Sequence, residues 1–216
     1  MKKELPSIIP VFPLSGVIYF PQTNLPLNIF ENRYLSLVMD TLKKDKLMGM
    51  IQAKKDGKDV YRIGCLGEIT DFKKTEDGRM LINLTGITRF EIKKEVANKK
   101  AYREFEVDYS KFTIDKNDLK NDKPSGDTLL GDYKNHIYLE KMQKFFKKNG
   151  LLLNWKEFEK LSNCQRINTL SMIAPISNEE KQKLIESISL NDKAKNLEEI
   201  IDFYLYDNSN DNRTLQ

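Results

Sequence analysis

The sequence predicts an α+β protein in which a partly closed β-barrel of mixed strands, with one helix, is followed by a C-terminal α-helical bundle. Two observations lead to this prediction. Residues 1–116 consist of short apolar segments separated by turn residues, and one early segment has helical spacing. Residues 128–206 place their apolar side chains at helical spacing, and a polar tail follows them. A chain of 216 residues forms one large domain or two modest ones.

The first segments belong to a proline-punctuated block that is almost free of charge. Residues 8–30 predict two short strands, at about 8–12 and 25–30, around a proline-rich bend. Proline fixes its own φ angle and donates no backbone hydrogen bond, so strands that contain it are short and bent. Residues 31–44 then predict a helix. Its apolar stripe consists of Tyr34, Leu35, Val38 and Leu42.

Residues 47–114 predict a run of strands. The first is a short apolar segment at 47–52 that ends in a charged turn. The next, at about 61–72, contains Gly64 and Gly67. Glycine in a strand marks a bulge or a close approach of another backbone at a barrel corner, so we expect one of these features at each position.

A hairpin turn follows this strand. Asp77-Gly78 favours a tight turn because both residues tolerate positive φ. The strand after the turn, at about 80–92, is expected to break at Gly86 and then resume. A last strand is expected at 102–114, where apolar residues alternate with polar ones.

A polar stretch at 117–127 is the best domain boundary in the chain, because it contains a proline, a glycine and many charged residues. We therefore expect a β-barrel domain at 1–116, a linker at 117–127, and a helical bundle with a polar tail at 128–216.

Four or five helices are expected after the linker. Gly150 should end the first of them, because glycine is favoured just beyond a helix C-terminus. Ser162 with Gln165, and Ser177 with Glu180, are capping boxes that open two later helices. The apolar face of the last helix consists of Leu197, Ile200, Ile201, Tyr204 and Leu205.

The charge distribution argues against a dedicated nucleic-acid binder. Residues 1–116 hold 21 Lys and Arg against 16 Asp and Glu, and residues 117–216 hold 15 against 16. Only 7 of the 36 basic residues are Arg, the residue favoured for bidentate contacts to phosphates and bases. No stretch has the length of a signal peptide or a membrane-spanning helix, so a cytoplasmic location without membrane contact is expected.

The sequence contains none of the common catalytic or cofactor motifs. It has no phosphate-binding loop, no dinucleotide-binding glycine pattern and no nucleophile elbow. Two cysteines and one histidine cannot build a zinc or iron–sulfur site from these residue types alone. We therefore predict no catalytic residue, no cofactor and no metal. A hydrolase would need either carboxylates that converge in a cleft or a reactive thiolate at Cys65 or Cys164, with His136 as the single histidine available to assist.

Several sequence blocks, spread over about residues 8–205, carry a family resemblance. They are Pro10–Leu14 with Phe20-Pro21, Leu25–Tyr34, Ile63–Ile69, Asp77–Arg79 with Gly86–Phe90, Asn154–Phe158, Asn168–Pro175 and Glu180–Glu186. Together they resemble the stand-alone relatives of the Lon protease N-terminal domain, which is also called the Lon substrate-binding domain.

This resemblance implies a PUA-like β-barrel with one helix, followed by a helical bundle. It also implies a role, because in full-length Lon this region helps to engage unfolded or tagged substrates and contributes to assembly. The ATPase and the Ser–Lys protease belong to later domains of Lon, and this sequence resembles neither. The resemblance therefore implies a non-enzymatic chain, and it transfers no individual binding residue.

The leading hypothesis is a protein- or peptide-binding module that engages unfolded or extended polypeptide segments. Candidate contacts are Val17, Tyr19, Phe20 and Leu25, because the connection that holds most of them places large apolar side chains in a turn region. The alternative that these four side chains only cover the barrel stays open. Pairing of an exposed edge strand with an extended peptide is a second way in which the module could bind its ligand.

The sequence leaves other partners open. An RNA-binding PUA-like protein is the alternative function, and it rests on analogy between folds. The expected partners are polypeptide segments or another protein, including the proteolysis machinery. The sequence does not define the oligomeric state.

Overall fold

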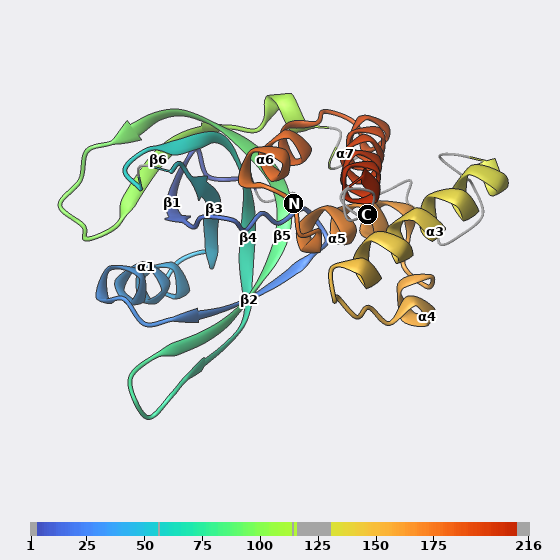
Figure 1. Cartoon of the computed structure of the whole chain (residues 1–216). Helices are drawn as coiled ribbons and strands as arrows, with labels where there is room; N and C mark the ends of the chain where they lie inside the picture. Colours follow the sequence, from blue (N-terminus) through green and yellow to red (C-terminus); the bar gives the residue numbers. More distant parts are fainter. Residues whose placement is uncertain (1–3, 56, 114, 116–130, 211–216) are drawn as a thin grey trace. The chain divides into compact units, whose positions relative to one another are not determined.

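The chain forms two compact units, Met1–Leu119 and Lys120–Gln216, which are described separately below. The computed structural model describes residues 4–55, 57–113, 115 and 131–210 (Figure 1), with side chains omitted at 131–137 and 207–210. The expected linker at 117–127 lies outside the described residues.

The N-terminal unit contains six strands, one α-helix and a short 3₁₀ turn among its described residues. The elements are β1 (Ile8–Pro13), β2 (Asn24–Ile29), α1 (Asn32–Leu42), β3 (Leu47–Ala53), β4 (Val60–Lys74), β5 (Met80–Val96), β6 (Arg103–Asp108) and η1 (Ser110–Phe112). Helix α1 lies close to the predicted bounds. The hairpin between β4 and β5 turns at Asp77-Gly78 as predicted, with Gly78 at a φ of 86°.

The six strands form one mixed sheet in the order β2-β5-β4-β3-β1-β6. Strand β1 runs parallel to β3, and the other pairs are antiparallel. The first half of β5 pairs with β2, and its second half pairs with β6, so the sheet curls back on itself. Because β2 pairs with β5 alone among the described strands, the barrel is open along this edge. The structure therefore confirms the predicted partly closed barrel of mixed strands.

Two predictions about the strands are wrong, namely the break in β5 at Gly86 and the end of the last strand at 114. Strand β5 runs through Gly86 without a break, because the Gly86 N–H donates to the Thr23 carbonyl and its own carbonyl accepts from Gln22. The irregularity expected there takes the form of a register shift in the β4–β5 pairing beside Gly86. Strand β6 ends at Asp108, whose side chain accepts a hydrogen bond from the Ser110 N–H and turns the chain away from the sheet.

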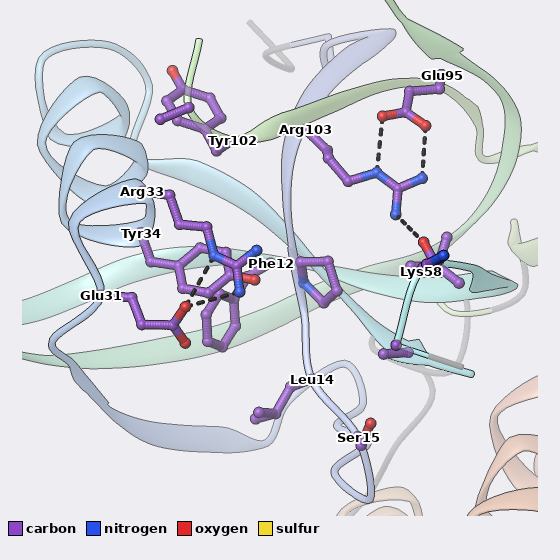
Figure 2. A pocket seen from close by; sticks show the side chains of 15 residues that line it. Phe12, Leu14, Ser15, Glu31, Arg33, Tyr34, Lys58, Glu95, Tyr102 and Arg103 are labelled. Carbon is purple, nitrogen blue, oxygen red and sulfur yellow. Dashed lines mark hydrogen bonds and ion pairs between the residues drawn. The ribbon is translucent and has the colours of Figure 1, made fainter. Parts of the chain in front are cut away.

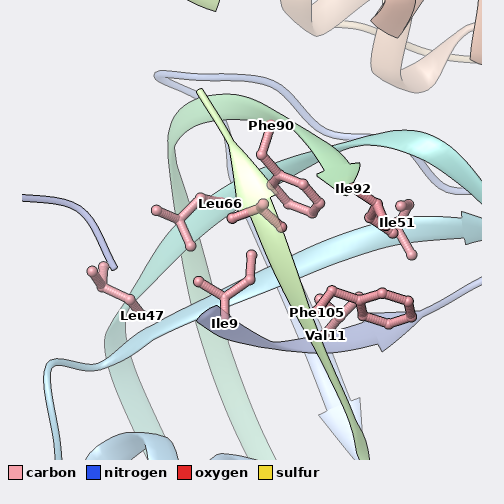
Figure 3. Packing of buried hydrophobic residues seen from close by; sticks show 9 residues of the cluster. Ile9, Val11, Leu47, Ile51, Leu66, Phe90, Ile92 and Phe105 are labelled. Atoms are coloured by element: carbon pink, nitrogen blue, oxygen red, sulfur yellow. The ribbon is translucent and has the colours of Figure 1, made fainter. Parts of the chain in front are cut away.

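The interior of the barrel is filled by one apolar cluster (Figure 3). Its members are Ile9, Val11, Leu47, Ile51, Leu66, Phe90, Ile92, Phe105 and Val107. A Cβ atom on Gly64 would stand 2.5 Å from the main-chain carbonyl oxygen of Met50 and 2.7 Å from Cζ of the Phe90 ring. This close packing confirms the expectation that a strand glycine marks a close approach.

The described part of the C-terminal unit contains five helices. They are α3 (Gly131–Lys148), α4 (Trp155–Phe158), α5 (Asn163–Ile173), α6 (Asn178–Glu186) and α7 (Leu190–Asn210). Both predicted capping boxes are present, since Ser162 and Gln165 exchange hydrogen bonds, as do Ser177 and Glu180. Gly150 has a φ of 70° just beyond α3, as a C-terminal cap requires.

Helix α7 packs against α3, α5 and α6 in this unit. Its inward side chains include Leu197, Ile200 and Ile201, which were predicted from their spacing and are buried. The structure confirms the α+β class with a helical bundle in the second half. Among the described residues, no helix has both the length and the hydropathy needed to cross a bilayer.

Candidate functional site

The predicted peptide contacts lie in or beside the connection between β1 and β2. Val17 is half-buried, whereas Tyr19, Phe20 and Leu25 are all at least nine-tenths buried. The premise that they form an exposed apolar patch therefore fails for the last three. Their role as peptide contacts stays a prediction.

The β1–β2 connection is buried because it folds back onto strands β4 and β5, where Gly67 and Gly86 have no side chain to exclude it. The Thr23 hydroxyl donates to the Phe20 carbonyl at 2.7 Å and accepts from the Phe20 N–H at 3.1 Å, which closes a tight turn. The Tyr19 hydroxyl reaches the space that a Cβ atom on Gly67 would occupy. Burial raises the pKa of this phenol well above its ordinary value. These residues therefore act as part of the core of the N-terminal unit.

The N-terminal unit has a groove elsewhere, with a volume of about 620 Å³. Figure 2 shows it from close by. The end of β1, the start of α1, the β3–β4 connection and the start of β6 contribute its lining. These segments are far apart in the sequence, and the curled sheet brings them together.

The floor of the groove is aromatic. The rings of Phe12 and Tyr34 meet edge to face, with centroids 4.3 Å apart and planes at 81°. Tyr102 also lines the groove, and its hydroxyl donates to the Asp40 carboxylate at 3.0 Å. The half-buried Leu14 extends this apolar surface along the chain after β1.

Two arginine–glutamate pairs stand on opposite sides of Phe12 (Figure 2). Arg33 donates from Nε to Glu31 at 3.0 Å, and its guanidinium carbon lies 4.5 Å from the Tyr34 ring centroid. Arg103 donates from Nε and Nη2 to the two carboxylate oxygens of Glu95, at 2.8 and 2.6 Å. A bidentate pair of this kind fixes both side chains, so the polar walls of the groove are preformed.

Arg103 also connects the groove to the β3–β4 connection. Its Nη1 donates to the main-chain carbonyl of Lys58 at 3.0 Å. The same side chain therefore orients Glu95 on β5 and the loop that carries Lys58. This single arginine, at the start of β6, joins two edges of the groove.

Loss of the arginine should change the titration of its partner. Hydrogen bonds from Arg103 hold the pKa of Glu95 below its ordinary value, which is about 4.3. The pair therefore stabilises the fold above that value and is lost as the pH falls through the lower folded-state pKa. In Arg103→Gln we expect the Glu95 pKa to return toward its ordinary value, as measured by NMR titration of the carboxyl carbon. An unchanged Glu95 pKa in this variant would contradict the assigned contact.

The groove has the chemistry of a binding surface. It offers aromatic and aliphatic contacts, fixed guanidinium and carboxylate groups, and one exposed hydroxyl at Ser15. Among the side chains that the structure describes, no histidine or cysteine lines it. Across the described part of the chain, no cluster of three or more His, Cys, Asp and Glu side chains could hold a metal ion.

The fold and the groove define a small α+β protein with a mixed barrel followed by a helical bundle. The model of one protein family, described as the ATP-dependent protease La (LON) substrate-binding domain, matches residues 8–202. The chain therefore belongs to the Lon substrate-binding domain family, as the sequence blocks indicated.

Relatives of known identity support this assignment. The Lon protease of Syntrophus aciditrophicus (strain SB) is 24% identical over 218 residues, which cover 94% of this chain and 26% of that protein. The Lon protease of Buchnera aphidicola subsp. Acyrthosiphon pisum (strain APS) is 27% identical over 201 residues, covering 90% of this chain and 25% of that protein. The chain thus spans about a quarter of the length of these relatives.

Solved structures agree on the fold. A Lon N-terminal domain protein from Xanthomonas campestris matches with a TM-score of 0.63 at 18% identity, covering 89% of this chain and 97% of that one. The N-terminal domain of a Mycobacterium avium complex Lon protease matches with a TM-score of 0.62 at 13% identity, covering 90% and 98%.

Sequence reasoning missed the groove. The sequence predicts a helix at 31–44 with Tyr34 in its apolar stripe, and it includes Glu31–Tyr34 in a family block, but it assigns no binding role to these residues or to Arg103. The signal was weak because the partners of these residues, such as Glu95 and Phe12, become neighbours only through strand pairing.

Proposed function

We propose that this chain binds polypeptide segments without cleaving them. The observation that carries the proposal is the groove of the N-terminal unit, which has an apolar floor and preformed polar walls in a chain of the Lon substrate-binding domain family. An apolar centre with a polar rim is the usual anatomy of a protein-binding surface.

The groove suits an extended chain. A side chain of the ligand can rest over Phe12 and Tyr34, while its backbone N–H and C=O groups meet the carboxylates and guanidinium groups of the walls. Because Arg33 and Arg103 are already hydrogen-bonded to Glu31 and Glu95, these four side chains lose little entropy on binding. The open edge of β2 is a less suitable peptide site, since Pro26 removes one backbone donor from that strand.

A titration with an unfolded model protein tests the proposal. We expect a fluorescently labelled, reduced and alkylated model protein to bind the full chain, and its folded counterpart to bind at least about tenfold more weakly. Ala101→Trp places a large ring in the groove at an exposed lining position and should abolish most of this binding. Ala97→Trp, exposed in the same connection and outside the lining, is the matched control.

Two results would contradict the proposal. One is the absence of any binding to the unfolded model protein by the intact chain. The other is equal loss of binding in Ala101→Trp and Ala97→Trp, because the groove would then have no special part in it.

The structure gives no support to the RNA alternative on the outer strands. Their basic side chains are paired across strands, as in Lys93 with Asp108 at 3.0 Å and Lys94 with Glu106 at 3.0 Å. A phosphate backbone would have to compete with these carboxylates for each cation.

A further inference from the structure

Two exposed loops beside the groove carry an excess of positive charge. Residues 54–59 and 97–102 contribute Gly57, Lys58, Ala101 and Tyr102 to its lining or edge. The sequences of these loops contain five lysines and two aspartates. One of the lysines, Lys100, forms an ion pair with Glu104 at 2.5 Å. The loops thus keep a net charge of +2 after this pair is counted as neutral.

The negative charges of the groove are already bound. The Glu31 carboxylate accepts from Arg33, and both oxygens of Glu95 accept from Arg103. A basic ligand would have to separate one of these pairs to gain a carboxylate partner. An acidic ligand would instead meet the exposed lysines Lys54 and Lys99 of these two loops, and reaching them breaks neither arginine–glutamate pair of the groove.

The aromatic floor of the groove and the positive charge of the two loops therefore favour a particular class of ligand. We propose, on the basis of the proposed function above, that the groove prefers polypeptide segments in which an apolar side chain is flanked by Asp or Glu. The apolar side chain lies on Phe12 and Tyr34, and the flanking carboxylates face the loops that carry Lys54 and Lys99. Electrostatic complementarity of this kind raises association rates and discriminates between partners.

Three short labelled peptides test the preference on the full chain. The first has a central Phe flanked by Glu residues, the second has Lys in place of Glu, and the third has Ser in place of Phe. Fluorescence anisotropy should show the Glu-flanked peptide binding about tenfold more tightly than the Lys-flanked peptide at about 0.05 M salt, with a smaller difference at about 0.3 M. The peptide without Phe should bind weakly at both salt concentrations.

Charge reversal of the chain locates the effect. The double variant Lys54→Glu and Lys99→Glu should remove the preference for the Glu-flanked peptide. The matched control is Lys73→Glu with Lys74→Glu, which changes the net charge equally at exposed positions outside the groove lining. Neither pair is buried, so both variants should fold.

The outcomes separate this inference from the proposed function. If unfolded protein binds and Ala101→Trp blocks it, but the Glu- and Lys-flanked peptides bind equally, the inference fails and the proposed function stands. Equal effects of the two double variants would also overturn the inference. If neither unfolded protein nor any peptide binds, the proposed function and the inference fall together. Binding of a single-stranded RNA oligonucleotide that depends on Lys54 and Lys99, without peptide binding, would assign the loops to nucleic acid.

Discussion

Replacement of Arg89 by methionine is expected to lower the free energy of unfolding of the N-terminal unit by about 3–5 kcal/mol. Arg89 on β5 is 1% exposed and Asp115 is 6% exposed. The arginine donates to the Asp115 carboxylate from its backbone N–H at 2.9 Å, from Nε at 3.0 Å and from Nη2 at 2.6 Å. The variant leaves this carboxylate buried without its guanidinium partner, and that unpaired charge is the main cost.

The guanidinium also contributes packing. Its central carbon lies 4.3 Å from the ring centroid of Phe112, so the ion pair and the aromatic ring form one buried stack. Asp115 stands seven residues after the end of β6 at Asp108. The pair therefore fastens the segment that leaves the last strand to the middle of β5.

Urea denaturation followed by circular dichroism measures the change, and hydrogen exchange of β5 and β6 amides assigns it to the N-terminal unit. The double variant Arg89→Met with Asp115→Leu should recover much of the loss, because replacing both members of a buried pair with apolar residues is often nearly neutral. A loss below about 1 kcal/mol in Arg89→Met would show that the pair does not hold this segment.

Local signals in the sequence predicted most of the elements. The capping boxes at Ser162 and Ser177, the turn at Asp77-Gly78 and the cap at Gly150 depend on interactions between residues a few positions apart. Such interactions form in nearly the same way in any fold, so residue type and spacing are enough to predict them.

The candidate site could not be predicted in this way. Its walls pair Arg103 with Glu95 across two strands, and its floor pairs Phe12 with Tyr34 from a strand and a helix. Each contact depends on the register of the sheet, and a register is a property of several strands together. The family resemblance gave the fold but said nothing about these pairs.

Tyr19 and Phe20 were predicted as peptide contacts in a turn region, but the structure buries both side chains. Their position between turn residues suggested exposure, whereas Gly67 suggested a bulge or a close approach of other backbone and Gly86 suggested a break in its strand. The structure shows that the apolar loop residues and the strand glycines pack against each other. The β1–β2 connection fills the space that a Cβ atom on Gly67 or Gly86 would occupy. Large apolar residues in a loop and glycines in facing strands predict burial when they are considered together.

Replacement of Gly86 by alanine is accordingly expected to destabilise the N-terminal unit by about 3 kcal/mol, at the upper end of the range for overpacked cores. A Cβ atom at this position would lie 2.0 Å from the Phe20 carbonyl oxygen and 2.7 Å from its carbon. Both are backbone atoms, and the carbonyl is held by hydrogen bonds from the Thr23 N–H and hydroxyl. The connection cannot move aside without losing that turn. Urea denaturation again gives the magnitude.

The control for this variant is Gly78→Ala, in the open hairpin turn, where no atom lies within 4 Å of the new methyl group. Its cost comes from the positive φ angle alone and should be about 1 kcal/mol. If the clash with Phe20 is the cause, Gly86→Ala combined with Thr23→Ala should cost less than the sum of the two single variants, because the freed connection can then shift. Strict additivity, or a Gly86→Ala variant as stable as the parent, would show that the connection does not press on β5.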